Sequence, residues 1–130
     1  MEHRNHYIAQ TVNTASPAHL VTMLYDKLLE SVRRVRHEFA AGGVVNAEMC
    51  HNELVRCQRI VEELRFGLDD ERGGEIATNL RRLYDYCHDL LLAANMAKSP
   101  EGLDDVETII GELRDVWFEQ VDKGQVLAPS

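Results

Sequence analysis

Apolar residues recur along most of the chain at alternating spacings of three and four residues, which places them on one face of an α-helix. The pattern is strongest in residues 73–95. Its predicted inner row is Ile76, Leu80, Leu83, Cys87, Leu90 and Ala94. A second row beside it is Ala77, Tyr84 and Leu91. Stripes of this width are typical of a helix that packs against other helices.

Three further segments show the same period. Ser16 followed by Pro17 predicts a helix start, because the serine oxygen can accept free amide hydrogens and proline loses no hydrogen bond there. The expected helices are residues 17–39, 45–66, 74–97 and 101 or 103 to 121. The inner rows of the other three are predicted to be Val21, Leu24, Leu28 and Val35; Cys50, Leu54, Cys57, Val61, Leu64 and Leu68; and Leu103, Val106, Ile110, Leu113 and Trp117. Adjacent apolar rows are Tyr25, Val32 and Phe39 in the first helix, and Ile109 and Val116 in the fourth.

Amphipathic helices joined by short loops predict an all-α fold, an antiparallel up-down-up-down four-helix bundle. The length of 130 residues is that of one domain. We expect residues 16–122 to form the bundle. Residues 1–15 lack a helical period, so we expect a mobile N-terminal segment, and we expect a disordered tail in residues 123–130.

Charge and composition exclude several classes of protein. A net charge of −8 argues against nucleic-acid binding, and the basic cluster Arg33, Arg34 and Arg36 fits a solvated helix face. The sequence has no apolar run of about 18 residues, so stable membrane insertion is not expected. The polar N-terminus lacks the apolar core of a signal peptide. Three cysteines without CxxC spacing favour a reducing, cytoplasmic location.

The search for chemistry yields one pattern with metal-ligand spacing. Glu48 with His51, and Asp85 with His88, have the carboxylate-x-x-His spacing of di-iron bundles. The helical period places all four outside the inner rows, where they cannot converge inside a bundle. Nucleotide-binding and hydrolase motifs are not found, and the cysteines read as small core hydrophobes. We therefore expect no enzyme, no metal and no cofactor.

The apolar faces of the first and third helices are wide, and periodicity leaves their use open. Ordinary core packing accounts for such stripes, and so does a groove that binds another chain in the helix-in-groove mode. A metal-binding bundle and a self-associating bundle, including a weak homodimer, are the alternatives that we retain.

Four stretches carry a family resemblance. TVNTASPAHLVTMLYDKLL, NELVRCQRIVEELRFGLD and GGEIATNLRRLYDYCHDLLLAAN, followed by LRDVW, resemble the flagellin-specific export chaperone family FliS, in order over about residues 7–119. The combination of TASP, MLYD, GGEIA and LYDY makes the resemblance specific. Cys87 stands where the family usually has methionine, and His19 stands where glutamate or glutamine is common.

The resemblance implies a cytoplasmic bundle that binds the disordered C-terminal segment of new flagellin and prevents its premature polymerisation. It also implies delivery of flagellin to the flagellar type III export gate, without a cofactor. Tyr7, with Ile8, matches a family tyrosine that packs over part of the flagellin surface when flagellin is absent, so residues 1–15 are a candidate plug for the binding groove. We add Leu20, Met23 and Leu24, on outer apolar rows near the start of the first helix, as candidate partner contacts.

Overall fold

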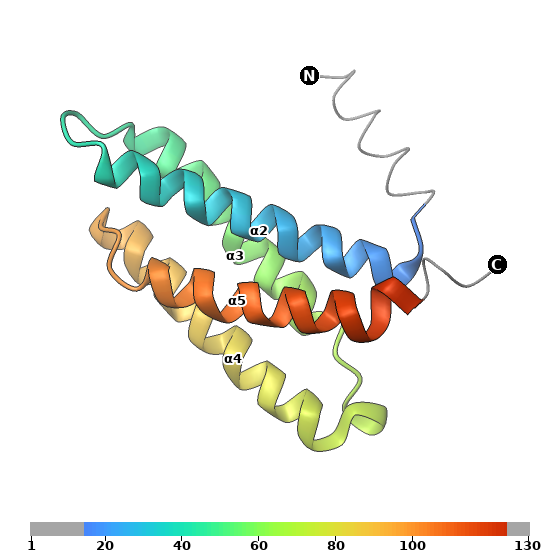
Figure 1. The fold of residues 1–130 in the computed structure, drawn as a ribbon. Helices are drawn as coiled ribbons and strands as arrows, with labels where there is room; N and C mark the ends of the chain where they lie inside the picture. The colour runs from blue at the N-terminus through green and yellow to red at the C-terminus, as the bar shows by residue number, and fades with distance from the viewer. Residues whose placement is uncertain (1–14, 125–130) are drawn as a thin grey trace.

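The computed structural model describes residues 15–124, and the regular structure in this range is helical throughout. The elements are α2 (Pro17–Ala40), α3 (Ala47–Phe66), α4 (Asp70–Ala97), α5 (Leu103–Trp117) and a short π-helix, η1 (Phe118–Asp122). Successive helices run in opposite directions, with α3 and α5 as the neighbours of α2 (Figure 1). The prediction of an antiparallel up-down-up-down bundle is confirmed.

The helix starts follow from capping side chains. Ser16 Oγ accepts the amide hydrogen of His19 at 3.1 Å, as predicted for the start of α2. Asn46 caps α3 in the same way, through the amide of Met49. The α4 helix begins at Asp70, earlier than predicted, because Asp69 caps a first turn that breaks at Gly74 (φ 51°, ψ −123°). The left-handed φ at this break favours glycine, which lacks a Cβ.

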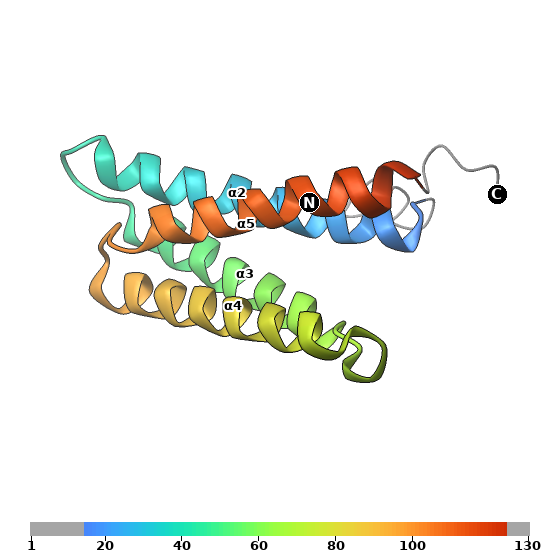
Figure 2. The same ribbon diagram turned by 60° about the horizontal axis from the view of Figure 1, so that its bottom comes forward.

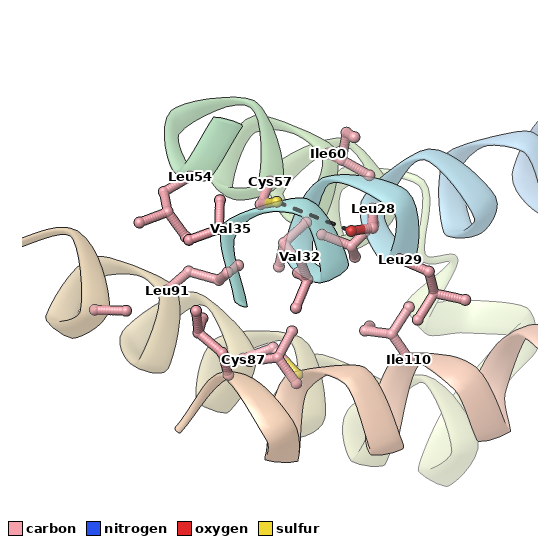
Figure 3. Packing of buried hydrophobic residues seen from close by; sticks show 14 of the residues in the cluster. Leu28, Leu29, Val32, Val35, Leu54, Cys57, Ile60, Cys87, Leu91 and Ile110 are labelled. Carbon is pink, nitrogen blue, oxygen red and sulfur yellow. Dashed lines mark hydrogen bonds between the residues drawn. The ribbon is translucent and has the colours of Figure 1, made fainter. Parts of the chain in front are cut away.

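The core lies between the four helices, and Figure 3 shows part of it. The predicted inner row of α3 is confirmed, with Leu68 only partly buried. In α2, Val21 and Leu24 are partly buried, while Tyr25 and Val32 of the adjacent row are fully buried. The three cysteines are free and buried, as predicted.

The predicted inner row of α4 is confirmed at Cys87 and Ala94, and Leu80 and Leu90 pack against the core, but the prediction was wrong for Ile76 and Leu83. Ile76 is 71% exposed and Leu83 is 36% exposed, although both were placed in the inner row. The residues of α4 that reach the core are Ala77, Tyr84, Cys87, Leu91 and Ala94. The reason lies in the neighbouring helix: α4 packs closely against α3 but makes far less contact with α5. The edge of α4 that faces α5 is therefore left uncovered.

The divergence of α4 and α5 is visible in two views. The helices are close at the loop that joins them and spread apart toward the start of α4 and the end of α5 (Figures 1 and 2). The same end of the bundle holds the start of α2 and η1. We call the side between α4 and α5 the open side of the bundle, because the exposed residues Ile76, Leu83 and Val116 lie on these two helices.

The C-terminal helix was predicted to stay regular to Val121, and this prediction was wrong. It ends as an α-helix at Trp117, passes through η1 and continues helically over Lys123 and Gly124. Residues 1–14 and 125–130 lie outside the described part of the chain, and the predictions for the N-terminal segment and the rest of the tail fall there.

Candidate functional site

The open side of the bundle carries six apolar residues, which together we call the α4–α5 face. It consists of Ile76, Leu80 and Leu83 on α4 and Ile109, Leu113 and Val116 on α5. Ile76 and Val116 are 71% and 61% exposed, whereas Leu80, Ile109 and Leu113 are partly buried against the core. The face therefore has a floor joined to the core and a rim of exposed side chains.

Contacts nearer the α4–α5 loop show which edge of α4 is turned toward α5. The Tyr86 hydroxyl donates to Asp105 of α5 at 3.4 Å. Leu90 lies against Gly102, directly before α5. Leu83 precedes these residues by three and seven positions, so it shares their edge, and Ile76 lies seven positions earlier still. Leu83 and Ile76 thus lie on the edge of α4 that α5 leaves uncovered.

The polar contacts of α5 show which side of this helix is turned toward α4. Glu107 and Arg114 both point to α2, where Glu107 meets Arg33 and Arg114 meets Asp26 at 2.8 Å. Val116 follows Arg114 by two positions and therefore lies about 200° around the helix, on the side away from α2. Its exposed side chain faces the open side of the bundle, toward α4.

Exposed apolar side chains on two facing helices are a candidate surface for protein–protein contact. Two diverging amphipathic helices with apolar residues at spacings of three, four and seven match the geometry that receives an amphipathic helix from another chain.

The partner residues predicted from the sequence lie elsewhere. Leu20, Met23 and Leu24 are partly buried, and Leu24 packs against the core. Leu20 lies fourteen positions, or four helical turns, before Arg34, which reaches Glu53 of α3 at 3.5 Å. This places Leu20 on the α3 side of α2, across the bundle from the α4–α5 face. Tyr7 and Ile8 lie outside the described residues.

The four residues with metal-ligand spacing are dispersed over the surface. His51 contacts Asn95, His88 contacts Glu62 at 3.2 Å, and Asp85 pairs with Arg65 at 2.7 Å. Within residues 15–124, no three His, Cys, Asp or Glu side chains are grouped so that they could hold a metal ion. The outward placement predicted from the helical period is observed.

The buried thiols are poor nucleophiles. Burial, reinforced by Glu53, raises the pKa of Cys57 to about 12. Burial also raises the pKa of Cys87 to about 12, with a smaller contribution from Asp105. Because the thiolate is the reactive form, both side chains act as small apolar groups in the core.

None of the helices in the described part of the chain is long and apolar enough to cross a membrane. The described structure is thus a helical bundle whose distinctive surface is an apolar face suited to another polypeptide. These features are typical of helical bundles that bind another protein.

The comparisons with known proteins identify the family. The family model "Flagellar protein FliS" matches residues 1–124. Flagellar secretion chaperone FliS of Salmonella typhimurium is 34% identical over 110 residues, covering 85% of this chain and 80% of that protein. The flagellar secretion chaperone FliS of Bacillus subtilis is 32% identical over 117 residues, covering 88% and 83%. The chain belongs to the FliS family of flagellar secretion chaperones, as the sequence motifs indicated.

Sequence reasoning missed the exposed state of Ile76, Leu83 and Val116. Ile76 and Leu83 were placed in the inner row and Val116 in an adjacent apolar row, because periodicity does not show which row a neighbouring helix covers. It also missed Asp122, a fully buried carboxylate in η1. An aspartate after the last periodic residues carries no pattern that predicts burial.

Proposed function

We propose that this chain is a cytoplasmic export chaperone. It binds the disordered C-terminal segment of flagellin, prevents premature polymerisation and delivers flagellin to the flagellar type III export apparatus. Family membership and the relatives' name, flagellar secretion chaperone, support the general role. The single structural observation that carries the proposal is the α4–α5 face, an apolar surface that the fold leaves without a partner.

In this proposal an amphipathic helix of flagellin lies along the open side of the bundle. Its apolar side chains contact Leu80, Ile109 and Leu113 at the floor and Ile76, Leu83 and Val116 at the rim. Burying an apolar side chain stabilises by about 1.5–3 kcal/mol, so three partly exposed rim residues contribute roughly 3–5 kcal/mol. Ordering a disordered segment costs about 2–5 kcal/mol or more. The two terms nearly cancel.

This balance means that the α4–α5 face alone gives weak binding, and a longer contact is needed. Leu20 and Met23, across the bundle on the α3 side of α2, supply a second apolar site in the proposal. A flagellin segment that wraps around the bundle reaches both surfaces. Binding in two places also keeps flagellin from presenting its apolar faces to other flagellin molecules.

Tyr7 and Ile8 are proposed to cover part of this surface when flagellin is absent. A cover of this kind lowers the apparent affinity by the fraction of time that the surface is open. It also shields an apolar patch that otherwise promotes aggregation. Tyr7→Ala is expected to change the affinity for flagellin while leaving the melting temperature nearly unchanged.

The proposal is tested by calorimetry with the full chain and a peptide of the flagellin C-terminal segment. We expect measurable binding that weakens in Ile76→Ser and Val116→Ser. Met96→Ser is the matched control, because Met96 is 80% exposed on α4 but lies outside the α4–α5 face. No heat at tens of micromolar peptide refutes the proposal. A dimer that persists unchanged with peptide, seen by light scattering, favours self-association instead.

A further inference from the structure

The polar contacts of α5 and η1 are strongly one-sided. In the C-terminal half of this helical segment, every described hydrogen bond to another element ends on α2. Trp117 Nε1 donates to the Ala18 carbonyl at 2.8 Å, and Arg114 pairs with Asp26. The described contact of α5 with α4 through polar atoms, Tyr86 with Asp105, is at the other end.

The strongest of these contacts involves a buried carboxylate. Asp122 Oδ2 accepts a hydrogen bond from Thr22 Oγ1 at 2.7 Å and lies 2.9 Å from His19 Nδ1. Asp122 and Thr22 are 0% and 1% exposed, so water does not screen their contact as it does a surface pair. The other oxygen, Oδ1, has no described partner.

The π-helix is what places Asp122 there. In an uninterrupted α-helix Val121 would face α2, because it follows Trp117 by four positions and Arg114 by seven. The wider turn of η1 accommodates one extra residue, so Asp122 takes that place instead. An apolar valine would have sufficed for packing. The irregular turn substitutes a carboxylate that bonds to two side chains of α2.

We propose that Asp122, Trp117 and Arg114 form a brace, the α2 brace, that positions α5 on α2 and so holds the α4–α5 face open. Without a restraint, Leu113 and Val116 would bury apolar area by moving toward Leu80 and Leu83. The α2 brace opposes this movement, because moving away from α2 would break the hydrogen bonds of Asp122, Trp117 and Arg114 to α2. The brace residues therefore act on binding through position and not through contact with the bound segment.

This inference rests on the proposed function for its role, but its structural part is testable without flagellin. Spin labels are placed at two exposed positions, Asn79→Cys on α4 and Glu112→Cys on α5, and the distance between them is measured by pulsed electron resonance. The native cysteines are buried, so the labels react at the new sites. We expect Asp122→Ala to shift the distribution to shorter distances than in the parent protein.

The matched control is Asp85→Ala, which removes an ion pair between α3 and α4 that is also 2.7 Å long. It is expected to leave the distance unchanged. Asp122→Asn and Trp117→Phe, milder changes checked by circular dichroism for folding, keep the test valid where Asp122→Ala does not fold. An unchanged distribution, or a shift to longer distances, in these folded variants overturns the α2 brace.

Peptide binding then separates the two claims. Closure of the face is expected to weaken flagellin peptide binding about tenfold, which corresponds to about 1.4 kcal/mol. A shortened distance in a protein whose parent form does not bind the peptide supports the brace and refutes the proposed function. Normal peptide binding with an unchanged distance refutes the brace and leaves the proposed function standing.

Discussion

The hydroxyl groups of Tyr25 and Tyr84 lie 2.5 Å apart in the centre of the bundle, where they join α2 to α4 across the diagonal. Both side chains are 3% exposed, and burial raises the pKa of each hydroxyl, so both are neutral at any ordinary pH. Each hydroxyl is the described partner of the other. The pair fixes the register of two helices that are not neighbours around the bundle.

Removing one hydroxyl of this pair should cost more than removing both. Tyr84→Phe leaves the Tyr25 hydroxyl buried without a partner, which destabilises by about 1–3 kcal/mol. Tyr25→Phe with Tyr84→Phe removes the unsatisfied group and is expected to lie closer to the parent protein. Urea denaturation of the parent protein, of Tyr25→Phe and Tyr84→Phe singly and of the double variant measures the coupling between the two hydroxyls. Additive losses in the double variant would show that the hydroxyls do not depend on each other.

The contact between Glu107 and two arginines should make stability depend on pH. Burial opposes ionisation of Glu107, but hydrogen bonds from Arg33 and Arg36, at 3.1 and 2.6 Å, outweigh it and hold the pKa below its ordinary 4.5. A lowered carboxyl pKa stabilises the fold above the unfolded-state value of 4.5. The contribution is lost as pH falls through the lower folded-state pKa.

Glu107→Gln tests this dependence through urea denaturation at several pH values. The parent protein is expected to lose up to about 1 kcal/mol more than the variant on acidification, a modest figure because the glutamate remains partly exposed to solvent. Glu112→Gln, on the same helix, is the control, since Glu112 is exposed and has no described ion pair. Parallel pH profiles for Glu107→Gln and the parent protein contradict the assignment.

Stability and binding should separate on the two apolar rows of α4. Ile76→Ser removes an exposed side chain and is expected to change the free energy of unfolding by about 0.5 kcal/mol or less. Leu91→Ala, at a position with 0% exposure, is expected to cost about 2–5 kcal/mol. Thermal or chemical denaturation gives both values. A large loss of stability in Ile76→Ser would mean that this edge of α4 is packed after all.

The cysteines should be unreactive in the folded protein. With pKa values of about 12, the Cys57 and Cys87 thiols contain almost no thiolate at pH 8, and both are fully buried. We expect a thiol-specific dye to react with them only after guanidinium unfolds the chain. Rapid stoichiometric labelling under native conditions would show that one of these core positions opens readily.

The accuracy of sequence reasoning differs between elements of the bundle, and the cause is physical. The α3 helix lies between two close neighbours, so every predicted inner residue from Cys50 to Leu64 is buried, with Ile60 and Glu53 buried in addition. The α4 helix has two apolar rows; Tyr84 is buried where it meets Tyr25 of α2, whereas Leu83, on the edge toward α5, is partly exposed. Which row is covered depends on tertiary contacts that a single helix does not encode.

The contacts that position α5 on α2 could not be predicted from the sequence either. Asp122 meets Thr22 across a hundred positions of the chain, through an irregular turn that no local signal announces. The family motifs identified the class of protein despite this. They did not indicate which apolar residues remain available to a partner.

Hydrogen exchange of the full chain, with and without the flagellin C-terminal peptide, tests the central claim most directly. Protection reports which amide hydrogens are stabilised by a bound partner. The account predicts that saturating peptide slows exchange in residues 76–83 of α4 and 109–116 of α5. Binding that leaves these two segments unchanged and protects other parts of the bundle would contradict the assignment of the α4–α5 face as the flagellin site.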